Sequence, residues 1–317
     1  MRFKTKEQVH TILGAGGSVS NVLTKELLRQ NKKVRLVSRS RYSIVGTESY
    51  KADITLFQET LKSIEGSNIV YLCIGLAYNT KVWELYWPII MENTINACKS
   101  VGAKLIFFDN VYMYGKVNGS MTETTPYNPI SKKGEIRAKI SLQLEEEIKR
   151  NNINAIIARS ADLYGPFATK TSLPYILSFS KIINNKKALI LINPSATHSF
   201  TYTTDCAKSL VLLAENEECD NQIWHLPTYN PALSAKSFTE QIAKEMNIRS
   251  NHFILKKWMI KINGLFNTSA KELLEMLYQN KYNYHFDSTK FNTHFEYNPT
   301  TYIDGIKSTI EFIKREK

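Results

Sequence analysis

The chain has 317 residues, of which 43% are hydrophobic and 22% charged, an ordinary globular composition. It holds no run of 18 apolar residues, so we predict neither a membrane span nor a membrane partner. The formal net charge is +12, but the basic residues are spread along the chain. This argues against nucleic acid and fits either an anionic small molecule or a solvated lysine-rich surface.

The cysteines and histidines give no sign of a metal site. Four cysteines are scattered without a C-x-x-C pair, and the six histidines form no H-x-x-x-H or H-E-x-x-H motif. We therefore predict no bound metal, and free thiols in a cytoplasmic protein.

Strand and helix patterns alternate from the start of the chain. Residues 9–13 are predicted to form a strand, 19 to about 31 an amphipathic helix and 34–37 a second strand, a βαβ unit of about 30 residues. Further strands are predicted at 68–76, 104–108 and 154–158, with helices at 86–101 and 134–149. This alternation predicts an α/β fold, a Rossmann-type doubly wound parallel sheet.

Beyond residue 166 the alternation is less regular. We expect a helix at 173–183, a strand at 187–192 and a helix through 204–213 with Thr204 or Asp205 as its N-cap. Residues 286–300 are predicted to form a small hairpin or strand that seats a last helix at 302–314.

A glycine loop joins the first strand to the first helix. Gly14, Gly16 and Gly17 allow close backbone approach, and the helix start offers free amides to a pyrophosphate. Read as G-x-G-x-x-G, the pattern meets Val19 at its third position; read as G-x-x-G-x-x-G, it meets the small Ser20. This placement predicts a dinucleotide site.

The second strand ends in Ser38 and Arg39, without the acidic residue that binds the ribose of NAD. A guanidinium can hold a 2′-phosphate, so we predict NADP rather than NAD, unless Arg39 is a solvated loop residue. Asp53 is expected to accept a hydrogen bond from the adenine amino group. The full predicted cofactor set is Gly14, Gly16, Gly17, Ser18, Val19, Ser38, Arg39, Asp53, Ile54, Cys73, Gly75, Arg137 and Asp162.

Three further segments are 107–115 (FFDNVYMYG), 159–166 (RSADLYGP) and 198–207 (HSFTYTTDCA). With the glycine loop, they resemble the extended short-chain dehydrogenase/reductase family, the NAD(P)-dependent epimerases and dehydratases, in an atypical form. The resemblance implies a cofactor domain at 1–165 with about 200–228. It also implies a smaller C-terminal α/β substrate domain at 166–199 and 229–317.

The resemblance also implies a serine or threonine and a Y-x-x-x-K pair, which this chain lacks. Asn110 stands at the serine position, and residues 128–137 (NPISKKGEIR) align Lys133 with the tyrosine and Arg137 with the lysine. We therefore expect Asn110 to orient an oxygen atom. We expect Lys133 to transfer a proton if burial or positive neighbours lower its pKa, with Tyr112 as the alternative donor. A surface position for Lys133 and a packing role for Tyr112 stay open.

Two functions remain open. One is an NADP-dependent reductase or epimerase/dehydratase acting on a sugar-like substrate, such as a nucleotide sugar, by hydride transfer. The other is a catalytically inactive NADP(H)-binding sensor or regulatory protein. A homodimer is expected from the resemblance.

Overall fold

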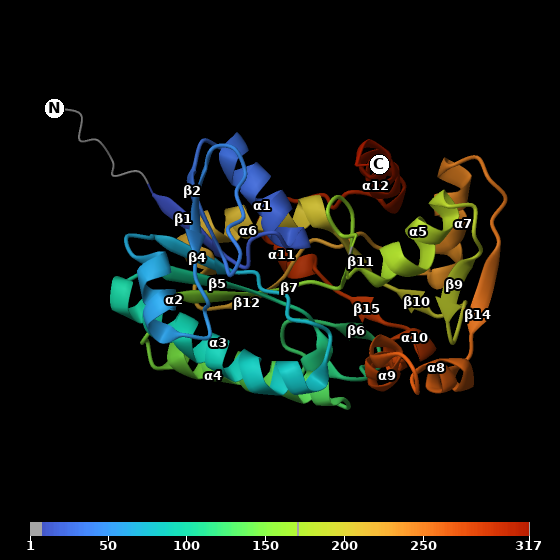
Figure 1. Cartoon of the computed structure of the whole chain (residues 1–317), viewed down its shortest axis with the longest axis horizontal. Helices are drawn as coiled ribbons and strands as arrows, with labels where there is room; N and C mark the ends of the chain where they lie inside the picture. Colours follow the sequence, from blue (N-terminus) through green and yellow to red (C-terminus); the bar gives the residue numbers. More distant parts are fainter. Residues whose placement is uncertain (1–7, 170, 317) are drawn as a thin grey trace.

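The structure is a computed structural model that describes residues 8–169 and 171–316. Its centre is a seven-stranded sheet in the order β12-β7-β5-β4-β1-β2-β3, and every neighbouring pair is parallel (Figure 1). The strands are β1 (Val9–Leu13), β2 (Lys33–Ser38), β3 (Thr47–Lys51), β4 (Ile69–Leu72), β5 (Lys104–Asp109), β7 (Ala155–Arg159) and β12 (Ile223–His225). The predicted α/β class with a doubly wound parallel sheet is confirmed. Residues 1–7 of the predicted first domain lie outside the described residues.

The strand order reverses at β1, whose two neighbours are β2 and β4. In open parallel sheets, ligands bind at such a switch point, outside the carboxyl ends of the strands. The edge strand β3 was not predicted, because its sequence is TESYK and its residues are only half-buried or exposed. A polar edge strand lacks the apolar run that marks a central strand.

Helices cover both faces of the sheet (Figure 1). α1 (Ser18–Arg29), α6 (Thr203–Glu215) and α11 (Thr289–His294) pack on one face around Ile12, Leu36 and Trp224. α2 (Phe57–Ile64), α3 (Thr80–Val101) and α4 (Lys132–Lys149) pack on the other around Leu13, Val70 and Phe107. The central strands are therefore buried on both sides, as their nearly continuous apolar sequences predict.

The remaining elements pair in short two-stranded sheets. β8 (Asp162–Tyr164) pairs with β11 (Phe200–Tyr202), β9 (Ala188–Leu191) with β14 (His252–Leu255), β10 (Thr197–His198) with β13 (Leu233–Ser234), and β6 (Ser120–Met121) with β15 (His285–Phe286). The helical elements here are the π-helix Tyr175–Phe179, α5 (Ser180–Ile183), α7 (Ala235–Glu245), α8 (Lys257–Asn263), α9 (Thr268–Leu273), α10 (Tyr278–Lys281) and α12 (Tyr302–Arg315). A separate apolar cluster, with Phe179, Phe238 and Ile306, holds α7 and α12 together.

One local expectation was wrong, and a second was met only in part. α6 begins at Thr203 after Tyr202, so neither Thr204 nor Asp205 is its N-cap. The Asp205 carboxylate instead accepts hydrogen bonds from Tyr297 Oη at 2.8 Å and from the Thr300 amide at 2.8 Å. Of the hairpin or strand expected in 286–300, only a short strand forms: β15, which ends at Phe286, pairs in parallel with the distant β6, and α11 follows it. Long-range hydrogen bonds decide both cases.

In the described part of the chain, none of the helices is both long and apolar enough to cross a bilayer. Within the same ranges, His, Cys, Asp and Glu side chains form no group of three or more that could hold a metal ion. The four cysteines are buried and free, as predicted.

Candidate cofactor and substrate site

The glycine loop lies at the carboxyl end of β1, where the strand order reverses. Gly14 and Gly16 have φ values of +101° and +88°, which favour glycine. A Cβ at Gly14 would lie 2.8 Å from the Cα atom of Ile74, so the loop also packs against the chain leaving β4. The amides of Gly14 and Ala15 both donate to Val37 O at 3.0 Å. These bonds fix the loop against the end of β2.

α1 opens towards this loop without a side-chain cap. Its N-cap is Gly17, which has no side chain, while Ser18 Oγ donates to Phe167 O at 2.9 Å. Val19 and Ser20 are both buried, and Ser20 Oγ donates back to Gly17 O at 2.9 Å. The first amides of α1 are therefore left for an anion at the positive end of the helix dipole.

The residues after β2 approach the same loop. Ser38 Oγ donates to Ser40 O, and the Arg39 side chain is exposed. Sequence reasoning missed Tyr42, whose Oη donates to Asn21 Oδ1 at 2.8 Å and whose ring would lie 3.4 Å from a Cβ at Gly16. Tyr42 thus covers the outer side of the glycine loop, although no motif marks it.

Asp53 follows β3 and starts a turn. Its Oδ1 accepts from the amide and the hydroxyl of Thr55, at 3.0 and 2.8 Å. The amide bond from Thr55 is the main reason that the pKa of Asp53 is lowered, and the positive charge of Arg39 adds to it. One carboxylate oxygen is therefore used in the turn, and Asp53 and Arg39 lie close enough to interact.

Ile54, Cys73 and Gly75 complete the predicted residues near the loop. Ile54 is buried, and the amide of Cys73 donates to Leu13 O at 2.9 Å. Burial raises the pKa of the Cys73 thiol to about 12, so it is a protonated packing residue rather than a nucleophile. Gly75 is exposed, and a Cβ there would meet open space. The structure thus brings the predicted residues of β1, β2, β3 and β4 to one edge of the sheet.

Asn110 and Tyr112 lie just beyond β5. Asn110 Oδ1 accepts from the Tyr112 amide at 3.0 Å, and the Tyr112 ring stacks on Trp83 with centroids 6.2 Å apart. Burial, with smaller effects from neighbours that include Tyr78 and Asp162, raises the pKa of Tyr112 well above its ordinary value. The Tyr112 phenol is therefore neutral.

Lys133 is fully buried, which excludes the surface alternative, but its neighbours are acidic and not positive. Its ammonium contacts Glu272, lies 2.7 Å from Glu275 Oε1 and donates to Thr80 Oγ1 at 3.0 Å. Carboxylates stabilise the charged form of a lysine, whereas the expected acid/base role needs positive neighbours or an apolar site. The partners come from α9 and the short helix Leu274–Met276, in a part of the sequence without a recognisable motif.

Arg137 points into a buried network rather than beside Lys133. Its Nε donates to Asp109 Oδ1 at 2.8 Å, and its guanidinium lies 4.4 Å from the ring centre of Trp87. Asp109 Oδ2 also accepts from Ser141 at 2.9 Å and lies 3.5 Å from Arg159 Nε. The Arg137 guanidinium is thus already paired, which leaves less of it for the predicted contact with a cofactor.

Asp162 lies near Tyr78 and Tyr112, since its charge helps to raise the pKa of both phenols. Its Oδ2 lies 3.0 Å from Nε2 of His198, and His198 stacks on Tyr284 with centroids 5.1 Å apart. His198 had not been singled out, although it lies in one of the matching segments. The pair lines the region between β8 and the C-terminal elements.

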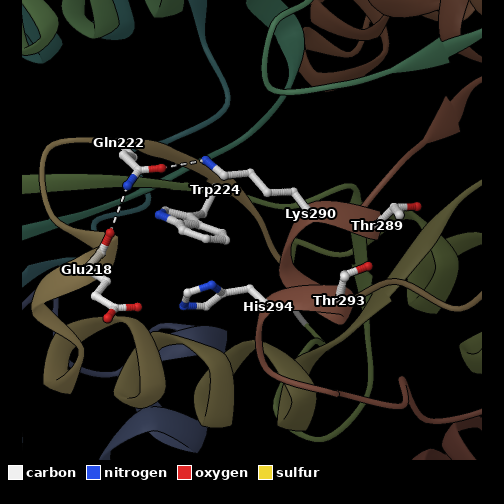
Figure 2. Close-up of a pocket in the computed structure, with 7 residues that line it drawn as sticks. All are labelled: Glu218, Gln222, Trp224, Thr289, Lys290, Thr293 and His294. Atoms are coloured by element: carbon white, nitrogen blue, oxygen red, sulfur yellow. Dashed lines mark hydrogen bonds between the residues drawn. The ribbon is translucent and has the colours of Figure 1, made fainter.

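A surface hollow of about 600 Å³ lies elsewhere (Figure 2). It is next to the edge strand β12, between α11 and the segment with Glu218 and Gln222 that follows α6, and contains none of the predicted site residues. Lys290 Nζ lies 3.9 Å from the ring centre of Trp224 and donates to Gln222 Oε1 and Ile223 O, both at 2.9 Å. Because the lysine covers the indole face, this hollow does not compete with the carboxyl edge as a candidate site.

The sequence model of the family described as "NAD dependent epimerase/dehydratase family" matches residues 10–226. The chain belongs to this family. The match supports an enzyme of the epimerase and dehydratase kind, and it confirms the resemblance drawn from the motifs. No curated protein matches the chain significantly.

Solved structures share the fold along the whole chain. A UDP-glucuronic acid 4-epimerase from Bacillus cereus, in complex with UDP-glucuronic acid and NAD, is 18% identical with a TM-score of 0.81, covering 98% of this chain and 100% of that one. A dTDP-glucose 4,6-dehydratase from Bacillus anthracis in complex with NAD is 14% identical with a TM-score of 0.81, covering 98% and 97%. The Thermus thermophilus UDP-glucose 4-epimerase complex with NAD is 13% identical with a TM-score of 0.79, covering 97% and 99%. At these identities the likeness shows the fold alone.

Proposed function

We propose that this family member binds a nicotinamide dinucleotide and acts on a sugar-like carbonyl or hydroxyl compound, in the first place a nucleotide sugar. One observation carries the proposal: a side-chain-free loop and the uncapped start of α1 meet at the switch point of the sheet. The neighbours crystallised with NAD and nucleotide sugars give the same direction by analogy.

The cofactor, when bound, would accept and return a hydride. Gly14, Gly16 and the amides of Ser18 and Val19 would hold its pyrophosphate. Asn110 uses Oδ1 to accept from a backbone amide, which leaves its Nδ2 group as a donor to a substrate oxygen. Tyr112 would hold or release the proton. Residues 166–199 and 229–317 would supply the substrate side of the site.

We propose NADP as the preferred cofactor, although the neighbours named above were crystallised with NAD. The argument rests on Arg39, which is exposed beside the loop where β2 ends without an acid. The test is a titration of the purified chain with NADPH and NADH, followed by fluorescence, for wild type and Arg39→Ala. The proposal expects a loss in NADPH affinity about tenfold larger than the loss in NADH affinity. Equal losses would exclude Arg39 from 2′-phosphate binding.

A regulatory protein that binds NADP(H) without turnover is the second candidate. It is favoured by Lys133 and Arg137, whose charged groups are bound to carboxylates inside the protein. End-point turnover assays with UDP-glucose, UDP-glucuronic acid and dTDP-glucose, in the presence of each cofactor, distinguish the two candidate functions. Tight cofactor binding without any conversion of these sugars supports the regulatory protein; conversion supports the enzyme.

A homodimer through α3 and α4 is part of the proposal. Leu85 and Ile89 on α3 and Leu142 on α4 are apolar but 36–56% exposed, and the two helices pack side by side (Figure 1). Sedimentation of wild type and Leu85→Glu tests it, since a charge there would separate the subunits. A cytoplasmic location also stays a prediction.

A further inference from the structure

Residues 256–266 expose an unusually apolar surface at the end of the molecule where α8 and α9 lie (Figure 1). The exposed fractions are 56% for Trp258, 52% for Ile262, 76% for Leu265 and 88% for Phe266. Single exposed apolar residues are common, but a contiguous group marks an interaction site. We call these four residues, with Lys256, Lys257 and Lys261, the basic apolar surface.

The four apolar residues lie on one face of α8 and of the turn that follows it. Their positions are spaced i, i+4, i+7 and i+8, and the turn continues past α8 because Leu265 N donates to Ile262 O at 3.1 Å. The opposite side of α8 carries Ile260, which is buried against Leu191 and Leu277. The fold therefore uses one side of α8 as an anchor and leaves a second apolar side in solvent.

The charged residues of the segment that carries this surface have a single sign. Between Glu245 and Glu272 the sequence has no acidic residue but five basic ones, Arg249, Lys256, Lys257, Lys261 and Lys271. Lys256, Lys257 and Lys261 are exposed, and none of them takes part in an ion pair among the described residues. Their field is therefore available to an anionic partner.

We propose that the basic apolar surface binds an anionic lipid bilayer, with the aromatic and aliphatic side chains in the interface and the lysines at the headgroups. Exposed Trp, Phe and Leu beside lysines are the composition that such peripheral contacts need. A second copy of the chain is disfavoured because pairing this face with itself would bring lysines against lysines. The proposal is independent of the catalytic one and revises the sequence-based expectation that no membrane is a partner; it requires no spanning helix.

The chain contains its own reporter for this contact. Of its four tryptophans, Trp83, Trp87 and Trp224 are at most 6% exposed, whereas Trp258 is 56% exposed. Vesicles of equimolar phosphatidylglycerol and phosphatidylcholine should shift the tryptophan emission of the full chain to the blue. The chain should also sediment together with these vesicles. Vesicles of phosphatidylcholine alone should do so far less, and about 0.5 M salt should weaken the binding to the anionic vesicles.

Matched variants test whether binding depends on this surface and not on the overall charge or hydrophobicity of the protein. Lys257→Ser with Lys261→Ser should lower affinity for the anionic vesicles about thirtyfold. Leu265→Ser with Phe266→Ser should lower it about tenfold or more. The controls are Lys62→Ser with Lys81→Ser, and Val45→Ser. These exposed positions lie in α2, in α3 and just before β3, and the control variants should bind as wild type does. Circular dichroism melts check that each variant folds.

The proposal is overturned if wild type does not prefer the anionic vesicles, or if both surface variants bind them unchanged. It is also overturned if wild type ignores vesicles but self-associates, with the association lost in Leu265→Ser with Phe266→Ser. That outcome would assign the surface to a second copy of the chain.

Discussion

The ammonium nitrogen of Lys133 lies 2.7 Å from Oε1 of Glu275, although 142 residues separate the two in the chain. Glu272 binds the same ammonium, and the lysine side chain is fully buried. This cluster ties α4, on the sheet part, to α9 and the short helix after it. A residue at the position that the family resemblance links to proton transfer thus also holds distant parts of the chain together.

Replacing both acids, Glu272→Gln with Glu275→Gln, should lower the free energy of unfolding by about 3 kcal/mol, because it leaves a buried ammonium without an opposite charge. Adding Lys133→Met should recover much of that loss, since no buried charge remains. Urea unfolding of the double and triple variants measures both effects. A triple variant no more stable than the double would show that the charge cluster does not account for the loss.

Asp109 offers a second buried charge to test. Asp109→Asn should cost about 3–5 kcal/mol, because the carboxylate serves the guanidinium groups of both Arg137 and Arg159 in a fully buried site. Glu146→Gln, which removes an exposed i,i+4 pair with Arg150, is the control and should cost less than about 0.5 kcal/mol. Chemical denaturation of both variants decides; similar small losses would contradict the assignment.

Two glycine substitutions distinguish the loop from its surroundings. Gly14→Ala should abolish dinucleotide binding and cost about 1–3 kcal/mol, because φ is +101° and the new Cβ would lie 2.8 Å from backbone at Ile74. Gly75→Ala adds a methyl group in open space and should retain stability. Calorimetric titration with NADPH and NADH checks the pair. Retained affinity in Gly14→Ala would argue against a pyrophosphate at this loop.

His225 predicts a loss of stability in acid. Its Nδ1 donates to Asp287 O at 2.7 Å and its Nε2 accepts from Tyr114 Oη at 2.8 Å, which defines a neutral ring. Burial lowers its pKa from 6.5 to about 3. Because only the unfolded chain takes up the proton below pH 6.5, this residue lowers the free energy of unfolding by up to about 1.4 kcal/mol per pH unit from pH 6.5 towards 3.

The check is urea unfolding between pH 7.5 and about 4 for wild type and His225→Asn. The variant should be less stable at neutral pH but should show a shallower pH dependence. An unchanged slope would mean that other groups, such as His10, whose pKa burial lowers to about 4, dominate the acid sensitivity.

The central sheet could be predicted because its buried strands have nearly continuous apolar sequences. β4 and β7 are apolar at nearly every position, and the glycines of the first loop follow a strand directly. The edge strand β3 could not, since its five residues are polar or only half-buried and show no apolar run. The N-cap prediction for α6 was wrong because the Asp205 carboxylate accepts a hydrogen bond from the amide of Thr300, 95 residues away. No local sequence pattern encodes such a bond.

The common position of the proposed cofactor residues, at one edge of the sheet, could be predicted from the sequence, whereas the surroundings of the proposed catalytic residues could not. The aligned segments place Asn110 just beyond β5, and Lys133 and Arg137 on α4. Their partners depend on tertiary packing: Glu272 and Glu275 reach Lys133 from a region without a motif, and Asp109 draws Arg137 away from the lysine. Charge environments of this kind follow from the folded chain and not from residue spacing.

The carboxylates around Lys133 and Arg137 also bear on any attempt to redesign this protein towards its relatives. Installing a tyrosine at 133 and a lysine at 137 would leave Glu272 and Glu275 facing a phenol, and Asp109 would face a shorter cation that cannot form a forked pair. The two positions are therefore not interchangeable parts. An engineered conversion would have to exchange the surrounding acids in the same step.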